Sequence, residues 1–107
     1  MHNSLEMKID EILSHLTLKE KIGQLNQLSA PKDDAGKERL KNRIRSGGVG
    51  SVILAFSSTA GNDEQRDTEV DVYNELQRVA VEESNSGIPV IFGRDVIHGH
   101  RTVMPIP

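Results

Sequence analysis

The residues best suited to chemistry lie close together in the segment 87–107, GIPVIFGRDVIHGHRTVMPIP. Asp95 follows an apolar run, Pro89 to Phe92, that is typical of a strand buried on both faces of a parallel sheet. Folds of the α/β class place ligand-binding side chains at the carboxyl ends of such strands, so the position of Asp95 fits a binding role. A lone aspartate there more often caps a turn or a following helix, and residue type and spacing alone favour capping.

Metal binding is a second chemistry that these residues could support. Asp95, His98 and His100 resemble a small ligand cluster, and a His-x-His pair after a barrel strand occurs in metal-dependent hydrolases. The remaining ligands of such a site cannot be identified, and the two histidines flank Gly99 in a predicted turn. A metal-dependent barrel hydrolase is therefore a disfavoured alternative, and we predict no metal and no cofactor.

Composition excludes several other classes of function. The chain has 107 residues, a formal net charge of −3 and no cysteine, which argues against nucleic-acid binding, disulfides and thiolate metal sites. No apolar run approaches the ~20 residues of a transmembrane helix, and residues 1–4 do not begin a signal peptide. We predict a soluble chain with neither a nucleic-acid nor a membrane partner. Its compartment stays open, because a signal removed before residue 1 would direct it to the periplasm or outside the cell.

The N-terminal half is predicted to be helical. Apolar residues at helical spacing form a stripe that consists of Leu5, Ile9, Ile12, Leu13 and Leu16. Thr17 and Glu20 form a capping box, which begins a second helix that continues to about Asn26 or Leu28. Gly23 within this helix indicates close packing against a neighbour. Both helices need a surface to cover.

A loop is predicted over residues 29–36, and a short basic helix over 37–45. With five basic side chains and a narrow apolar face, this helix is expected to be solvated rather than to bind phosphate or membrane. Gly47 or Gly48 suits the left-handed position that ends it.

The C-terminal half reads as strand, helix, strand. Val49–Ala55 is the first convincing strand, residues 56–67 form a long loop, and Thr68 begins a helix from about Glu69 to Ser84. The second strand follows at Pro89, and this order predicts a parallel βαβ unit. Two parallel strands need more neighbours than this to be stable, so we expect the chain to be the beginning of something larger.

Three stretches carry a resemblance to a known family, namely LTLKEKIGQL, GGVGSVIL and the C-terminal segment 87–107, and the expected helix VYNELQRVAVEES lies between them. In this order and spacing they resemble the N-terminal part of glycoside hydrolase family 3, the β-glucosidase family. The resemblance implies an α/β fold, the N-terminal part of a (β/α)8 barrel spanning residues 1–107, incomplete, with about two parallel strands and flanking helices. Val49–Ala55 would be the first barrel strand and Pro89–Gly93 the second.

Membership would imply a retaining hydrolase of terminal β-linked sugars, acting on a β-linked oligosaccharide or glycoside. Such enzymes use two carboxyl groups about 5–5.5 Å apart. In the family both are supplied by segments that would follow residue 107, so no catalytic residue is predicted within this chain.

One sugar-binding residue can be carried over from the family. Asp95 resembles the aspartate that accepts hydrogen bonds from sugar hydroxyls in subsite −1, and the resemblance makes this role favoured over capping. Gly99 would allow a tight turn, and His98 and His100 would support the loop by packing and hydrogen bonds. Arg94 departs from the small or apolar residue frequent at its position, which could alter the surroundings of Asp95.

The alternative is a fragment without catalysis. The chain could bind carbohydrate weakly or self-associate, through apolar barrel edges that we expect to be exposed at Val49–Ala55 and Val90–Phe92. On either interpretation we predict that the 107 residues alone have no glycosidase activity.

Overall fold

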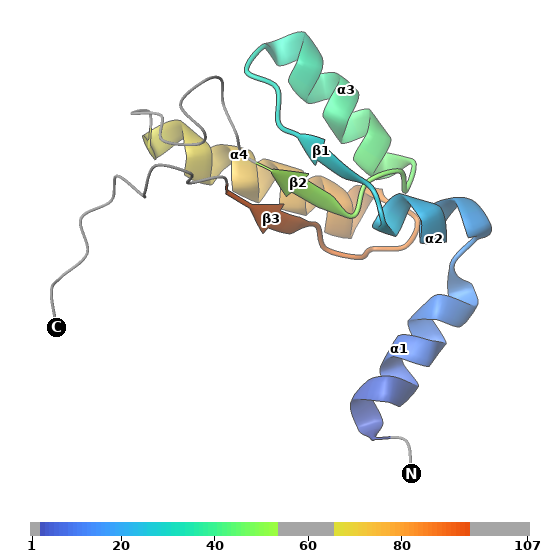
Figure 1. Ribbon diagram of the computed structural model, residues 1–107. Helices are drawn as coiled ribbons and strands as arrows, with labels where there is room; N and C mark the ends of the chain where they lie inside the picture. Colours follow the sequence, from blue (N-terminus) through green and yellow to red (C-terminus); the bar gives the residue numbers. More distant parts are fainter. Residues whose placement is uncertain (1–2, 54–65, 95–107) are drawn as a thin grey trace, which may run out of the picture.

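The computed structural model describes residues 3–53 and 66–94, and the side chains of the second range from residue 70 onward (Figure 1). Over these residues the chain forms a three-stranded parallel sheet in the order β1-β2-β3. The elements are α1 (Ser4–His15), α2 (Leu18–Gln24), β1 (Gln27–Ser29), α3 (Asp34–Arg45), β2 (Ser51–Ile53), α4 (Arg66–Arg78), the π-helical turn η2 (Val79–Glu83) and β3 (Ile91–Gly93). The α/β class and the parallel sheet are as predicted.

The number of strands corrects the sequence-based prediction. Helix α2 ends at Gln24 instead of continuing to Asn26 or Leu28, and the chain enters β1 three residues later, at Gln27. Residues 27–30 alternate between exposed and more buried positions, which is strand periodicity. The first strand is therefore β1, and the segment predicted to be first, Val49–Ala55, contains the central strand β2.

Helices α3 and α4 lie on the same side of the sheet (Figure 1). This follows from the topology, because successive right-handed crossovers in one direction place their helices on one face. Leu28, Val52 and Phe92 are aligned across the three strands and pack into the core beneath these helices. The fully enclosed part of the core consists of Ala30, Leu40, Ile44, Val49, Val52, Leu76, Val79, Ala80 and Val90.

Helix α3 differs from the solvated helix that we predicted. Leu40 and Ile44 are 4% and 2% exposed and join the core, so two apolar residues one turn apart suffice to anchor a highly charged helix. The helix begins at Asp34, inside the predicted loop, because the Asp33 side chain caps it by accepting a hydrogen bond from the Gly36 N–H at 2.7 Å.

The close packing predicted from Gly23 is confirmed. A Cβ atom at Gly23 would lie 1.8 Å from the carbonyl oxygen of Gly47, so only glycine lets α2 approach the turn that follows α3. Gly47 itself has φ +75°, which confirms its predicted left-handed position. The capping box of Thr17 and Glu20 is confirmed as well.

Helix α1 is an amphipathic helix, as predicted, but it buries no residue in the part of the chain that the structure describes. Asn3 and Glu6 form a capping box at its start, which the sequence analysis did not identify. Its apolar stripe remains exposed, for example Leu5 at 61% and Ile12 at 48%. Among the described helices, none combines the length and apolar character needed to cross a bilayer.

Helix α4 begins at Arg66, so Thr68 lies inside it and is not the predicted cap. Its C-terminal end passes into η2, and the whole helical segment ends at Glu83, one residue before the predicted end. Gly87, with φ +64°, turns the chain toward β3. Together these turns bring β3 beside β2.

Candidate functional site

The carboxyl ends of the three strands meet at one edge of the sheet. Ser29, Ile53 and Gly93 share a row in the parallel register, and Arg94, which is half-buried, continues from Gly93. This is the edge where α/β folds bind ligands. Asp95, His98, Gly99 and His100 lie outside the described residues, so their proposed roles stay predictions. The described structure accounts for the strand that leads to them.

The start of β3 is held by hydrogen bonds to two neighbours, the residue that precedes β2 and a side chain of α4. The Ile91 N–H donates to the Gly50 carbonyl at 3.0 Å, while the Gln77 amide of α4 binds both peptide groups of Val90. Gln77 Nε2 donates to the Val90 carbonyl at 3.1 Å, and the Val90 N–H donates to Gln77 Oε1 at 2.7 Å. One side chain thus satisfies Val90 as a neighbouring strand would.

An aromatic pair adds to this support. Tyr73 of α4 meets Phe92 of β3 edge to face, with ring centroids 4.6 Å apart and planes at 89°. Such a pair contributes about 0.5–1.5 kcal/mol beyond area burial. Helix α4 therefore fixes the height and tilt of β3, and with them the point at which Gly93 ends the strand.

The face of the sheet opposite the helices is bare in the described structure. Alternation along the strands directs six residues to it, namely Gln27, Ser29, Ser51, Ile53, Ile91 and Gly93. Gln27 Nε2 donates to Ser51 Oγ at 2.8 Å. A Cβ atom at Gly93 would lie only 3.9 Å from the same Nε2, so the Gln27 side chain extends from β1 over β2 toward β3.

Sequence reasoning missed Gln27 because it assigned this segment to a helix. The signal that could have identified it is the alternation of polar and apolar residues from Gln27 to Ala30, QLSA, a period of two. It missed Gln77 for another reason: a glutamine on a half-buried helix face gives no sign of which backbone it will bind.

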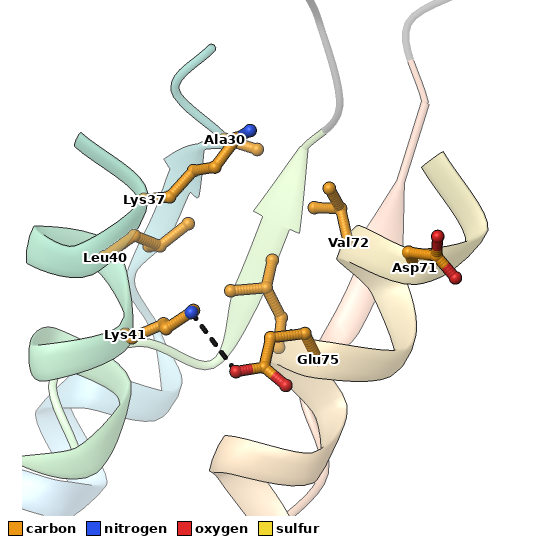
Figure 2. A pocket seen from close by; sticks show the side chains of 8 residues that line it. Ala30, Lys37, Leu40, Lys41, Asp71, Val72 and Glu75 are labelled. Carbon is orange, nitrogen blue, oxygen red and sulfur yellow. Dashed lines mark ion pairs between the residues drawn. The ribbon is translucent and has the colours of Figure 1, made fainter. Parts of the chain in front are cut away.

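A cavity of about 190 Å³ lies on the other side of the sheet, between α3 and α4 (Figure 2). Its apolar walls are Ala30, Leu40, Val72 and Leu76, and its charged rim includes the ion pair between Lys41 and Glu75, whose Nζ and Oε1 are 3.1 Å apart. It lies on the helical side of the sheet, and one of its walls, Ala30, directly follows the carboxyl end of β1.

Comparison with known proteins identifies the family of this chain. Residues 17–106 match the glycosyl hydrolase family 3 N terminal domain, which is most of the chain and includes all three strands. The chain belongs to glycoside hydrolase family 3. The sequence resemblance is thereby confirmed. The match begins at Thr17, the cap of α2, and so leaves out α1, the helix that buries nothing.

A curated relative agrees with the family 3 assignment. The chain is 33% identical over 98 residues to a periplasmic beta-glucosidase from Salmonella typhimurium. The aligned region is 92% of this chain but 11% of that protein, so the chain spans about a tenth of the length of its relative. The activity of a whole family 3 protein is accordingly a proposal for this chain.

Glycosidases act through carboxyl groups, which makes the surroundings of the described carboxylates in this family 3 chain relevant to function. Glu20 is 7% exposed: Asn85 Nδ2 donates to its Oε1 at 2.9 Å, and the Thr17 N–H donates to its Oε2 at 2.8 Å. These hydrogen bonds, that of Asn85 first, lower the pKa of Glu20. Glu20 precedes β1 and Asn85 precedes β3, which places the pair at the amino edge of the sheet, where it joins α2 to the β3 connection.

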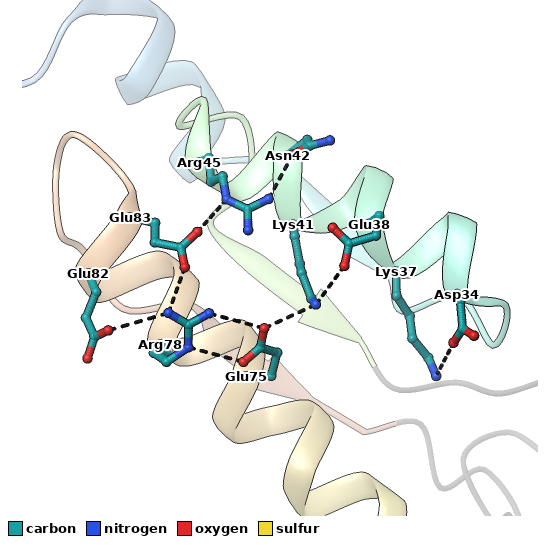
Figure 3. A network of polar contacts seen from close by, with 10 residues as sticks. All are labelled: Asp34, Lys37, Glu38, Lys41, Asn42, Arg45, Glu75, Arg78, Glu82 and Glu83. Carbon is teal, nitrogen blue, oxygen red and sulfur yellow. Dashed lines mark hydrogen bonds and ion pairs between the residues drawn. The ribbon is translucent and has the colours of Figure 1, made fainter.

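Other carboxylates belong to an ion-pair network between α3 and the α4–η2 segment (Figure 3). Arg78 and then Lys41 hold the pKa of Glu75 at about 2, and Arg45 and Arg78 lower the pKa of Glu83. A general acid needs a raised pKa, and a nucleophile must face the ligand. The network meets neither condition, because its pKa values are lowered and it lies on the outer helices.

Metal binding was the alternative chemistry. Over residues 3–53 and 66–94, no three side chains of His, Asp or Glu gather closely enough to hold an ion. The cluster predicted from Asp95, His98 and His100 lies beyond these residues and is not tested by this result.

Proposed function

We propose that this chain forms the N-terminal part of the barrel of a retaining β-glycosidase of the β-glucosidase type. The substrates would be β-linked oligosaccharides or glycosides, cleaved at a terminal sugar. The observation that carries the proposal is the family 3 match over residues 17–106. The parallel sheet supports it, because helices on one face and a bare opposite face are what a sector of a (β/α)8 barrel requires.

Asp95 is proposed to accept hydrogen bonds from two hydroxyl groups of the bound sugar. A carboxylate suits this role because it has two acceptor oxygens and forms stronger bonds than a neutral group. Gly93 ends β3, so Asp95 follows the strand end by two residues, at the edge where barrel enzymes bind substrate. Gly99 would permit the turn beyond it, with His98 and His100 supporting the loop.

The two catalytic carboxyl groups are proposed to come from outside these 107 residues. The described carboxylates are consistent with this division, because Glu20 and Glu75 are engaged in structural contacts away from the carboxyl edge. The chain alone would then bind part of a sugar without cleaving it.

Self-association is a second proposal, with one observation in its favour. Within the predicted edge Val90–Phe92, Ile91 is 72% exposed on the bare face of the edge strand β3, where an apolar surface could dock, whereas Val90 is 4% exposed and was wrongly expected to be exposed. The other surface predicted for this role, Val49–Ala55, was wrongly expected to be an exposed edge: β2 is the central strand, and Val49 and Val52 are 4% and 0% exposed. Sedimentation that shows only monomer at high concentration would end this proposal.

The test of the main proposal is hydrolysis of chromogenic β-glycosides by the full-length protein, purified from the cells that naturally produce it. Asp95→Ala should lower kcat/KM about a hundredfold or more, because at least one charge-assisted bond worth about 1.5–3 kcal/mol is lost with each hydroxyl. Asp10→Ala, in exposed α1, is the matched control and should be unchanged. Wild-type protein that hydrolyses no β-glycoside would refute the function. If Asp95→Ala were as active as wild type, the proposed role of Asp95 would be refuted. Hydrolysis by residues 1–107 alone would refute the proposal that both catalytic carboxyl groups lie outside them.

A further inference from the structure

We propose that α2 is an interface helix with two working sides. One side is bound to the described sheet, and the other, formed by Leu18, Ile22 and Leu25, docks against the part of the protein that continues the barrel. The inference rests on the proposed function only in taking the chain as one sector of a barrel. It extends that proposal by assigning an interface with a defined place, the amino edge of the sheet.

The two sides of α2 are the reverse of those of an ordinary surface helix. Leu18 and Ile22 of the helix and Leu25 at its C-cap recur at i, i+4 and i+7, so they share one side, and they are 73%, 60% and 89% exposed. Glu20 and Gly23 share the opposite side and are the residues that the helix buries. A helix on the surface of a finished fold buries its apolar side instead. The reversal indicates that α2 has a neighbour on each side.

The buried side of α2 is fixed to the segments that lead into the strands (Figure 1). A Cβ atom at Gly50, the residue before β2, would lie 2.2 Å from the carbonyl oxygen of Gln24, the last residue of the helix. In the first turn of the helix, Glu20 accepts a hydrogen bond from Asn85, in the connection to β3, at 2.9 Å. The helix therefore spans the starts of two strands. It cannot turn its apolar side toward the sheet without losing both contacts.

The place of the apolar side identifies its occupant. In a closed barrel the amino ends of all strands form one ring, and β1, β2 and β3 supply only part of that ring. A helix fixed at the amino ends of these strands is a neighbour of the strands that complete the ring. The aligned region is 11% of the family 3 relative, so most of that protein lies outside the part that matches. The occupant that we assign is the corresponding remainder of this protein, at its strand-entry segments.

The composition of this side of α2 suits such a contact. Lys19 and Lys21 are exposed on its two flanks and give the apolar stripe the charged rim that is usual at interfaces. Of the 11 large hydrophobic side chains exposed in the described structure, all but Val70, Val81 and Ile91 lie within residues 5–25. The apolar surface that lacks cover is thus concentrated at this end of the chain. Docking would cover the stripe and leave the lysine ammonium groups in water.

The experiment measures thiol accessibility on α2 in the full-length protein, produced from its own gene. The 107 residues hold no cysteine, and Ile22→Cys replaces one apolar side chain by a smaller one of similar character. Lys21→Cys, one residue away on the exposed flank, is the matched control. Labelling by iodoacetamide is followed by mass spectrometry of the peptide that contains the new thiol. We expect Ile22→Cys to label at least about fiftyfold more slowly than Lys21→Cys, because a docked side chain reacts only when the interface opens.

Equal labelling rates for the two variants would overturn the inference, because the apolar side would then be open in the whole protein. Protection that disappears on dilution would identify a second copy as the occupant. Protection that persists in the 107-residue chain would identify the chain's own residues as the cover, and either result overturns the inference. The readout does not depend on activity. Failure of the proposed function would appear separately, as wild-type protein that hydrolyses no β-glycoside whatever the labelling rates.

Discussion

The two faces of the sheet differ in what their residues do. On the covered face Leu28, Val52 and Phe92 pack beneath α3 and α4, and ion pairs join the two helices above them. On the bare face Gln27 and Ser51 form a polar pair beside exposed Ile91. The comparison indicates that, within the described residues, the stabilising contacts are concentrated on the helical side of the sheet.

This difference is what a barrel enzyme needs. Barrel strands carry helices outside, whereas their inward side chains and carboxyl ends form the core and the active site. Within this family 3 chain, the cavity between α3 and α4 lies on the outer side, and the network of lowered pKa values lies there too. Among the described residues, the carboxylates of lowered pKa in this network do not mark the candidate site. The candidate site is identified by the direction of the strands, because their carboxyl ends meet at one edge of the sheet.

The largest expected effect tests the difference in stability between the two faces. Leu76→Ala, at a site of α4 that is 2% exposed, should lower the free energy of unfolding by about 3 kcal/mol, because it leaves a cavity in the core. Ile91→Ala, at a site 72% exposed, should change it by less than about 0.5 kcal/mol. Urea denaturation of the 107-residue chain measures both.

Repeating this pair of variants in the protein as the cell makes it would sharpen the comparison. If further strands close a barrel over the bare face, Ile91→Ala should become costly there, at about 2 kcal/mol or more, while Leu76→Ala stays the same. Equal, large losses at both sites in the 107-residue chain would contradict the comparison.

A smaller effect is expected at Gln77, which connects α4 to Val90, the residue before β3. Gln77→Met should cost about 1–3 kcal/mol, because it leaves the N–H and carbonyl of Val90 without the amide that binds both. Hydrogen exchange at the Val90 amide should accelerate accordingly, and Gln24→Met serves as the control. An unchanged exchange rate at Val90 would show that the Gln77 contact does not hold β3.

Patterns within a single element were predictable from the sequence. The capping box of Thr17 and Glu20, the close approach at Gly23 and the left-handed Gly47 all depend on local chemistry, and each was confirmed. The family assignment was predictable too, because LTLKEKIGQL and IPVIFGRDVIHG carry it in the residues themselves.

Features that depend on tertiary pairing were not predictable. Strand β1 is three residues long, and Gln27–Ser29 becomes a strand only because β2 lies beside it. By local propensity alone, the helix that begins after Thr17 was expected to continue through these residues. For the same reason the direction of the Gln27 side chain could not be predicted, since it is set by the register with Ser51.

The smallest expected effect concerns Glu20, which lies on neither face but at the amino edge, and it should alter stability without altering ligand binding. The hydrogen bonds of Asn85 and Thr17 lower its pKa below the ordinary value of 4.5 in the folded protein. A group with a depressed folded pKa contributes stability that is present above its unfolded pKa and is lost as pH falls through the folded pKa.

Glu20→Gln should therefore be less stable than wild type near pH 7, and the difference should shrink as pH falls below about 4.5, because protonation removes the same charge from wild type. Glu75 and Glu83 also lose stabilising charge in acid, but they do so in both proteins, so the difference between the two curves isolates Glu20. Thermal unfolding at a series of pH values measures it. A difference that is constant with pH would mean that the hydrogen-bonding shape of Glu20, rather than its charge, holds α2 to the β3 connection. A changed KM for a β-glucoside would mean that the amino edge and the ligand face are coupled, contrary to the separation proposed between stability and binding.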